Sequence, residues 1–202
     1  MRYTQIPTNT FSALQMNAGI VLADFDVTDG SFEDTDLLGA TSGGVNVTAT
    51  PEFSDFGEDV DNCPKNMLEL KHLDSWEVKM SGTFVSVTKA TAAKLLAAAD
   101  TNGNKITPRA DVVKTDFSDI WWVGDYTDVN TGANAGFLAV HVMNALSTGG
   151  FQIQSTDKGK GQFAFEFTGH VSIDAQDVVP IEIYVKEGTA SNANPGTGGA
   201  TS

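Results

Sequence analysis

The chain has 202 residues, and its 26 acidic against 12 basic side chains give a formal net charge of −14. That length suits one domain with a sizeable core. The acidic balance argues against a surface that binds nucleic-acid phosphates or an anionic membrane, because both need clustered Lys and Arg. No apolar run approaches the roughly 20 residues that span a bilayer. The single cysteine, Cys63, excludes an intrachain disulfide.

The first 16 residues have no periodic pattern and predict an irregular N-terminal arm, and the polar stretch 29–44 predicts a loop. Alternating or continuous apolar runs predict strands at 17–25, 45–50, 75–87, 105–117, 119–126, 136–146 and 180–186. The run 136–146 is apolar at nearly every position, so we expect its strand to be buried on both faces. Residues 188–202 are of low complexity and predict a disordered tail.

The clearest strand pattern lies at 162–173, where Phe163, Phe165 and Phe167 share one face and Glu166 and Thr168 share the other. Twelve residues would span about 40 Å, which is long for a strand. One helix is predicted at 91–100, capped by Thr88 or Thr91, with an apolar stripe that packs on a sheet. The coarse fold is an antiparallel β-sandwich or open barrel with one helix.

The segment 51–73 is too long for an ordinary structureless loop in a compact domain, so we interpret it as a protruding arm, with a plain surface loop as the alternative. Its carboxylates Asp55, Glu58, Asp59 and Asp61 suit a solvated or subunit-contacting charge run better than a cation site or catalytic pair. The aromatic side chains suit core or interface packing, and they are Trp76, Trp121, Trp122, Phe163, Phe165 and Phe167.

Catalytic and metal-binding patterns are weak. The loop 100–111 places Asp and Asn at the first positions of a calcium loop but lacks its glycine and its final glutamate. His72, His141 and His170 have no metal-ligand spacing, and His141 is interpreted as a satisfied core or interface residue. Neither a nucleophile elbow nor a phosphate loop occurs. We therefore expect a protein that is not an enzyme and uses no cofactor or metal.

Six segments together resemble the major tail proteins, or tail tube proteins, of long-tailed, non-contractile bacteriophages of Gram-positive hosts. They are LDSWEVKMSGTF (73–84), DIWWVGDY (119–126), HVMNALSTGGFQIQ (141–154), KGKGQFAFEFTGH (158–170), VPIEIYVK (179–186) and the segment 51–73 with its core FGEDVDNCPKN. The resemblance covers about residues 17–187 and leaves out the C-terminal tail.

This resemblance implies a tail tube fold of two roughly orthogonal antiparallel sheets flanked by one helix. It implies that six copies form a ring and that rings stack into a hollow tube that conducts DNA. Six copies would carry a formal charge of −84, and an acidic lumen would repel DNA. Glu166 and Thr168 are candidates to face that lumen. The arm would stack one ring on the next through Phe53, Asp55, Phe56, Glu58, Asp59, Asp61 and Lys65.

The implied partners are further copies of the chain, the tape measure protein, and the terminator and distal tail proteins. DNA would pass without specific binding, no membrane would be involved, and the virion tail would assemble in the host cytoplasm. Two other functions stay open from the residues. One is a carbohydrate- or receptor-binding module that uses Trp121 or Trp122, and the other is a carboxylate enzyme that uses the cluster between Asp55 and Asp61.

Overall fold

The computed structural model describes residues 6, 10, 14–126 and 135–188, so most of the predicted N-terminal arm and C-terminal tail lies outside the described residues. The first sheet has the strand order β2-β1-β7-β8-β10. Its strands are β1 (Gln15–Leu22), β2 (Leu37–Gly39), β7 (Ser118–Tyr126), β8 (Phe137–Ser147) and β10 (Ile181–Lys186).

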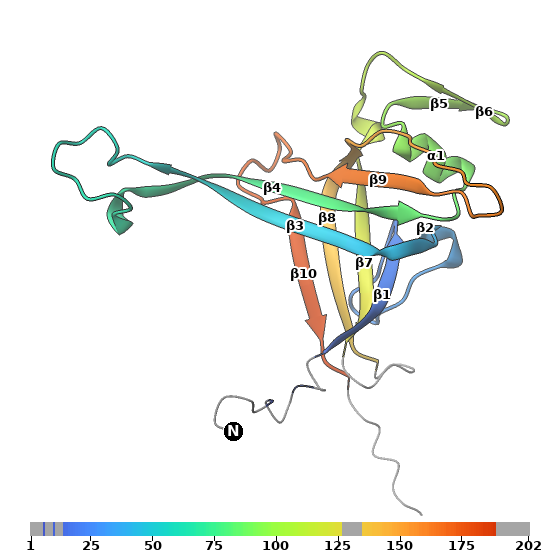
Figure 1. Ribbon diagram of the computed structural model, residues 1–202, viewed down its shortest axis with the longest axis horizontal. Coiled ribbons are helices and arrows are strands. Elements are labelled where there is room, and N and C mark those ends of the chain that lie inside the picture. Colours follow the sequence, from blue (N-terminus) through green and yellow to red (C-terminus); the bar gives the residue numbers. More distant parts are fainter. Residues whose placement is uncertain (1–5, 7–9, 11–13, 127–134, 189–202) are drawn as a thin grey trace, which may run out of the picture.

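The second sheet has the order β9-β4-β3, with β3 (Thr41–Asp55), β4 (Lys71–Phe84) and β9 (Phe163–Thr168). The last residues of β8 pair with β9 and so join the two sheets, and all strand pairs are antiparallel. The strands of the second sheet cross those of the first (Figure 1). The predicted fold of two antiparallel sheets flanked by a helix is therefore confirmed, and the sheet is open.

The main core fills the space between the two sheets and the helix. Its buried residues are Val21, Leu38, Val78, Met80, Phe84, Leu95, Ile120, Val142, Ala145, Phe165 and Phe167. A smaller cluster covers the other face of the first sheet and contains Leu22, Phe25, Trp121, Phe137 and Ala139. Neighbouring residues of a strand face opposite sides. Consequently the first sheet is apolar on both faces, and the prediction that β8 is buried on both sides is correct.

The helix is shorter than predicted. Helix α1 (Lys89–Leu95) begins after Thr88, whose hydroxyl oxygen accepts a 3.1 Å hydrogen bond from the Thr91 amide. Ala97 then adopts a φ of 62°, which ends the helix. The following residues form β5 (Ala99–Asn102) and pair with β6 (Lys105–Pro108). The predicted helix 91–100 is thus wrong at its end, because helix propensity is a weak preference that strand pairing overrides.

The predicted strand 105–117 is also wrong beyond Pro108, and β6 pairs with β5 rather than with β7. The segment continues through a short 3-10 turn, η4 (Lys114–Asp116). Arg109 binds Asp100 at 2.9 Å and also contacts Asp116. The first part of the stretch 100–111 therefore belongs to a β5–β6 hairpin, and Asp100, the first residue of the partial calcium-loop pattern, is in an ion pair with Arg109.

Strand β9 has six residues rather than the twelve expected for 162–173. Gly169 ends it at a crowded place, where a Cβ atom would lie 3.0 Å from a Val142 methyl group and 3.1 Å from the Pro180 carbonyl oxygen. The phenylalanine face is as predicted, with Phe165 and Phe167 almost fully buried. In the predicted loop 29–44, the structure has the turn η2 (Asp34–Asp36), strand β2 and the start of β3.

The predicted arm does protrude, but its local structure differs from a loop. Strand β3 runs out to Asp55 and β4 returns from Lys71, so a two-stranded ribbon carries the end loop 56–70, which includes the turn η3 (Leu68–Leu70) (Figure 1). Near Gly82 of β4, the partner strand β3 carries extra residues between Thr41 and Val45 and so forms a bulge. We call the ribbon and end loop, residues 51–74, the arm.

Candidate assembly interfaces

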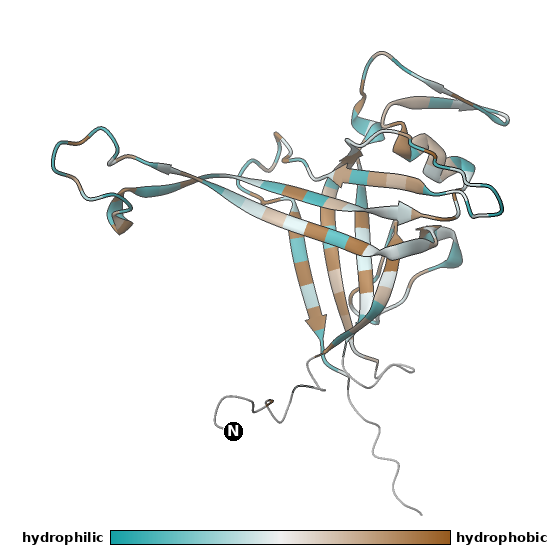
Figure 2. Ribbon diagram, in the orientation of Figure 1, coloured by the Kyte–Doolittle hydropathy of each residue, from teal (hydrophilic) through white to brown (hydrophobic). Residues whose placement is uncertain are grey.

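The arm carries the apolar face of the core out beyond the body of the protein. On β3, Val47 and Ala49 pack against the main core, and Phe53 continues the same alternation outward. On β4, Val78 is fully buried, whereas Trp76 and Leu73 farther out are 37% and 42% exposed. Phe53 is 52% exposed. Phe53, Leu73 and Trp76 thus form a partly exposed apolar stripe. Trp76 borders the segment 176–180, whereas farther out none of the described elements lies over the ribbon, whose inner part alternates between hydrophilic and hydrophobic residues (Figure 2).

The end loop of the arm is organised by Asp55. Its carboxylate accepts hydrogen bonds from the Gly57 amide at 2.9 Å and the Asn66 amide at 3.1 Å. The remaining charged residues predicted for the arm, Glu58, Asp59, Asp61 and Lys65, are exposed. Phe56 is 65% exposed and lies beside the His72 ring. Asp55 therefore shapes the loop, while the other predicted arm residues face solvent, where a partner could reach them.

Strand β10 ends the first sheet, and no strand of the described part of the chain pairs with its outer edge. The Met143 amide donates to the Pro180 carbonyl at 3.0 Å, and the register then alternates along the pair β8–β10. Because hydrogen-bonded pairs alternate along an antiparallel ladder, the N–H and C=O groups of Glu182 and Tyr184 point toward β8. The N–H and C=O groups of Ile183 and Val185 point outward. The side chains of Ile183 and Val185 are 63% and 56% exposed. Such an edge is a template for another strand.

The opposite edge of the same sheet is β1, which pairs with β2 only at Val21 and Leu22. Its register against β7 shifts between Met16 and Ile20, where Asn17 and Gly19 adopt φ angles of 65° and 70°. Gly19 permits a close approach, because a Cβ there would lie 2.5 Å from the Trp122 indole nitrogen. That nitrogen donates to the Ala18 carbonyl at 3.1 Å. Trp122 thus holds the bulged edge of β1 in shape.

A polar network ties the three strands β7, β8 and β10 together. The His141 ring stacks on Trp121 with centroids 3.9 Å apart. Its Nε2 lies 3.2 Å from an Asp119 carboxylate oxygen, without the alignment of a hydrogen bond, and its Nδ1 lies 3.1 Å from Glu182. The Tyr184 hydroxyl donates to Glu182 at 2.7 Å. His141 packs in the structure as predicted, but its Nε2 is not satisfied by an aligned hydrogen bond, and the neighbours Asp119 and Glu182 were not predicted.

Because of this network, the folding stability of the protein is expected to depend on pH in the acidic range. The Tyr184 hydroxyl, followed by His141, lowers the pKa of Glu182 below its usual value of 4.5. Because the folded state then binds fewer protons, the stabilisation is present above about pH 4.5 and is lost as the pH falls through the folded-state pKa. We expect acidification from pH 6 to 3 to lower the Tm of Glu182→Gln by about 1–2 °C less than that of the unmodified chain, since exposed pairs contribute little.

Thermal denaturation followed by circular dichroism at each pH measures this difference. Glu187→Gln, at the exposed residue after β10, is the matched control and should follow the unmodified chain. Equal acid sensitivity of Glu182→Gln and the unmodified chain would show that the contacts of Glu182 do not contribute.

The remaining residues singled out from the sequence lie on both faces of the second sheet, and Trp121 lies on the first sheet. Phe163 is half-buried and contacts the Phe151 ring at 5.9 Å. Glu166 and Thr168 lie on the face away from the phenylalanines and hydrogen-bond Thr148 at 3.0 and 2.9 Å. Their orientation toward a lumen stays a prediction. Trp121 is only 7% exposed, so its ring offers no open platform for a sugar.

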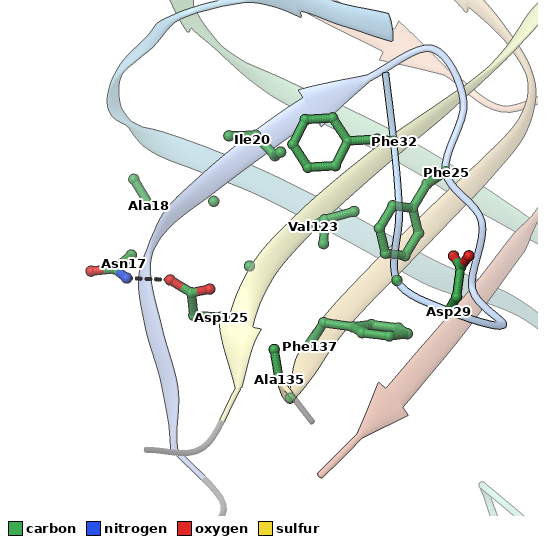
Figure 3. A pocket seen from close by; sticks show the side chains of 14 residues that line it. Asn17, Ala18, Ile20, Phe25, Asp29, Phe32, Val123, Asp125, Ala135 and Phe137 are labelled. Carbon is green, nitrogen blue, oxygen red and sulfur yellow. Dashed lines mark hydrogen bonds between the residues drawn. The ribbon is translucent and has the colours of Figure 1, made fainter. Parts of the chain in front are cut away.

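A pocket of about 440 Å³ lies between β1, the end of β7 and the segment that precedes β2 (Figure 3). Phe25, Phe32 and Phe137 line it, and Asn17 donates a hydrogen bond to Asp125 at its rim. Its lining brings together no nucleophile and base. Among the described residues, no group of three or more His, Cys, Asp or Glu could hold a metal ion, and no helix is long and apolar enough to cross a membrane.

Comparisons with known proteins give a distant likeness. No family model matches the chain, and no curated protein matches it. Among solved structures, it is similar to a chain of the tail of an empty GTA particle with C6 symmetry, at 9% identity and a TM-score of 0.36. The match covers 78% of this chain and 96% of that chain. A likeness this distant carries no argument, so the function must be inferred from the geometry of the chain itself.

Proposed function

We propose that this protein is a structural subunit of a phage-like tail tube. Six copies form a ring, and rings stack into a hollow tube through which DNA passes. The arm and the adjoining Trp76 carry this proposal, because Phe53, Leu73 and Trp76 extend the apolar core face outward and stay 37–52% exposed. Exposed apolar surface of this kind marks a binding site, and a two-stranded ribbon is marginally stable unless something packs on it.

The two edges of the first sheet support the same proposal. Strand β10 lies at one edge and β1, with the short β2, at the other. Pairing of β10 in one copy with the β1 edge of the next is a head-to-tail contact, which closes into a ring when the rotation suits it. A closed ring also removes exposed edges that would otherwise favour aggregation. The C6 symmetry of the GTA tail agrees with this proposal, which does not depend on it.

In this arrangement the first sheet forms the wall of the tube. The face of that sheet away from the main core carries Asp119, Asp125 and Glu182, and the adjoining segment 24–36 has six carboxylates and no basic residue. An acidic wall repels DNA within a screening length of about 8 Å at physiological salt. Glu166 and Thr168 belong to the second sheet and would then lie outside the lumen, unlike in the expectation from sequence.

The role of the chain is then passive. It conducts DNA without a catalytic step or cofactor, and its partners are other copies, the tape measure protein, and the terminator and distal tail proteins at the ends of the tube. Electron microscopy of the purified full chain at increasing concentration tests the proposal. Rings with sixfold symmetry and tubes of constant diameter are expected. A chain that stays monomeric at every concentration and salt would contradict it.

A further inference from the structure

Charge is distributed unevenly between the two ends of the molecule. The arm, residues 51–74, has seven carboxylates and two lysines, a net charge of −5. The segments 85–118 and 148–162 together have seven basic and four acidic residues, a net charge of +3. These segments include α1, the β5–β6 hairpin and the loop before β9, and they lie at the end of the molecule away from the arm (Figure 1). We call them the basic end.

Part of the positive charge of the basic end is neutralised within the chain. Arg109 binds Asp100 and Asp116, and Lys114 lies 3.5 Å from Asp174. Four lysines remain exposed, and in the described part of the chain no carboxylate lies within salt-bridge distance of them. They are Lys89, Lys105, Lys158 and Lys160.

The basic end also exposes apolar side chains. Phe151 and Ile153 are 40% and 59% exposed, and the Phe151 ring contacts Phe163 at the edge of the core. Lys89 holds α1 to the β5–β6 turn, since its Nζ donates to the Gly103 carbonyl at 3.0 Å. A cationic surface with an apolar centre complements the arm, which has exposed carboxylates and an apolar stripe.

We propose that the arm of one copy docks on the basic end of the copy beside it in the same ring. Glu58, Asp59 and Asp61 face the lysines, while the stripe of Phe53, Leu73 and Trp76 covers the Phe151 region. The proposal rests on the self-assembly proposed above and adds the surface that the arm binds. Opposite charges across such an interface fix the register and exclude wrong partners.

The arrangement of the sheet edges favours this lateral contact. In Figure 1 the arm projects on the side of the β10 edge, and the basic end lies on the side of the β1–β2 edge. A copy that brings its β1 edge to β10 therefore brings its basic end to the side of the arm. One head-to-tail interface satisfies both contacts. The arm would then join neighbours within a ring, whereas the resemblance to tail tube proteins implies a contact between rings.

Charge reversal in the full chain tests this contact. The arm variant Glu58→Lys, Asp59→Lys, Asp61→Lys and the end variant Lys105→Glu, Lys158→Glu, Lys160→Glu are each expected to lower the ring fraction by about tenfold or more, since like charges then meet. The chain with all six reversals should form rings again, because the charges complement once more. Native mass spectrometry and electron microscopy measure the ring fraction, and circular dichroism checks folding.

The variant Asn46→Lys, Thr50→Lys adds positive charge at exposed sites on the face of β3 away from the core, outside both surfaces and both edges of the first sheet, and should assemble normally. Rings of the arm variant that fail to stack would overturn the lateral contact in favour of a stacking role. Normal rings and tubes from the arm variant, or no recovery with all six reversals, would overturn the inference while self-assembly stands. A monomeric unmodified chain would contradict the proposed function itself.

Discussion

Replacing residues 53–74 with Asn-Gly is expected to give a folded protein that no longer assembles. The exchange removes Phe53 and Leu73 of the stripe together with the end loop, and keeps the pair of Glu52 and Ser75, whose side chains are hydrogen-bonded at 2.7 Å. Asn-Gly closes a two-residue hairpin of the type that suits twisted strands. The buried Val78 and Met80 remain in place. The Tm should therefore change by no more than about 4 °C, while tubes and rings are lost.

The boundaries of this exchange depend on the register. A deletion of 54–66, which sequence alone would suggest, removes Ser54 and Asp55 and so leaves their partners His72 and Lys71 on β4 unpaired. Unpaired strand residues favour non-specific association, and this would obscure the result. The exchange of 53–74 cuts both strands at one paired position and avoids that problem.

Electron microscopy and light scattering on the exchanged chain measure assembly. Two substitution variants provide matched controls for the chemistry of the stripe. Phe53→Ser with Leu73→Ser should weaken assembly, whereas Leu68→Ser, at an 85% exposed residue of the end loop, should not. Tubes of normal diameter from the exchanged chain would show that the arm is not an assembly surface.

Local patterns predicted those features that depend on neighbouring residues alone. The alternation of Phe163, Phe165 and Phe167 gave the buried face of β9, because side chains of a strand alternate whatever the strand pairs with. The opposite facing of Trp121 and Trp122 follows for the same reason, and the two rings belong to different apolar clusters. The cap at Thr88 was foreseeable because a hydroxyl before an alanine-rich stretch is a strong helix start.

Features that depend on long-range pairing were not predictable in this way. The residues after Ala97 favour a helix locally, yet they pair with β6. The arm appeared as a loop because its strand residues mix polar and apolar types, and only the pairing of β3 with β4 shows that they form a ribbon. Strand β9 ends just before Gly169, which the fold crowds against Val142 and Pro180.

The residues of the candidate interfaces likewise fall into those that sequence could locate and those that only the structure shows. Sequence located the charges and aromatic residues of the arm, because they are contiguous. It could not show that His141 lies between Asp119 and Glu182, since Glu182 is 41 residues away along the chain. Nor could it show which strands end the first sheet, because an edge is defined by an absent neighbour. The edge at β10 therefore yields a prediction that only the register makes possible.

Ile183→Pro is expected to block ring formation while the monomer stays folded. The backbone N–H of Ile183 points away from β8, so proline removes no hydrogen bond among the described residues. The extended backbone of Glu182 is compatible with a following proline. A strand approaching from a second copy, however, would lose a bond and meet the pyrrolidine ring. The ring fraction should fall to background, with a loss of folding stability of about 1 kcal/mol or less, because the edge position is exposed.

Two further substitutions distinguish the contribution of the Ile183 backbone N–H to ring formation from that of its side chain. Ile183→Thr keeps the N–H and the β-branched shape, so it should still form rings if backbone pairing is what joins the copies. Tyr184→Pro removes an N–H that bonds β8 and should destabilise the monomer by about 3 kcal/mol. Normal rings from Ile183→Pro, measured by native mass spectrometry, would exclude the β10 edge as the contact. Loss of rings in Ile183→Thr as well would assign the contact to the exposed side chain, and not to the ladder.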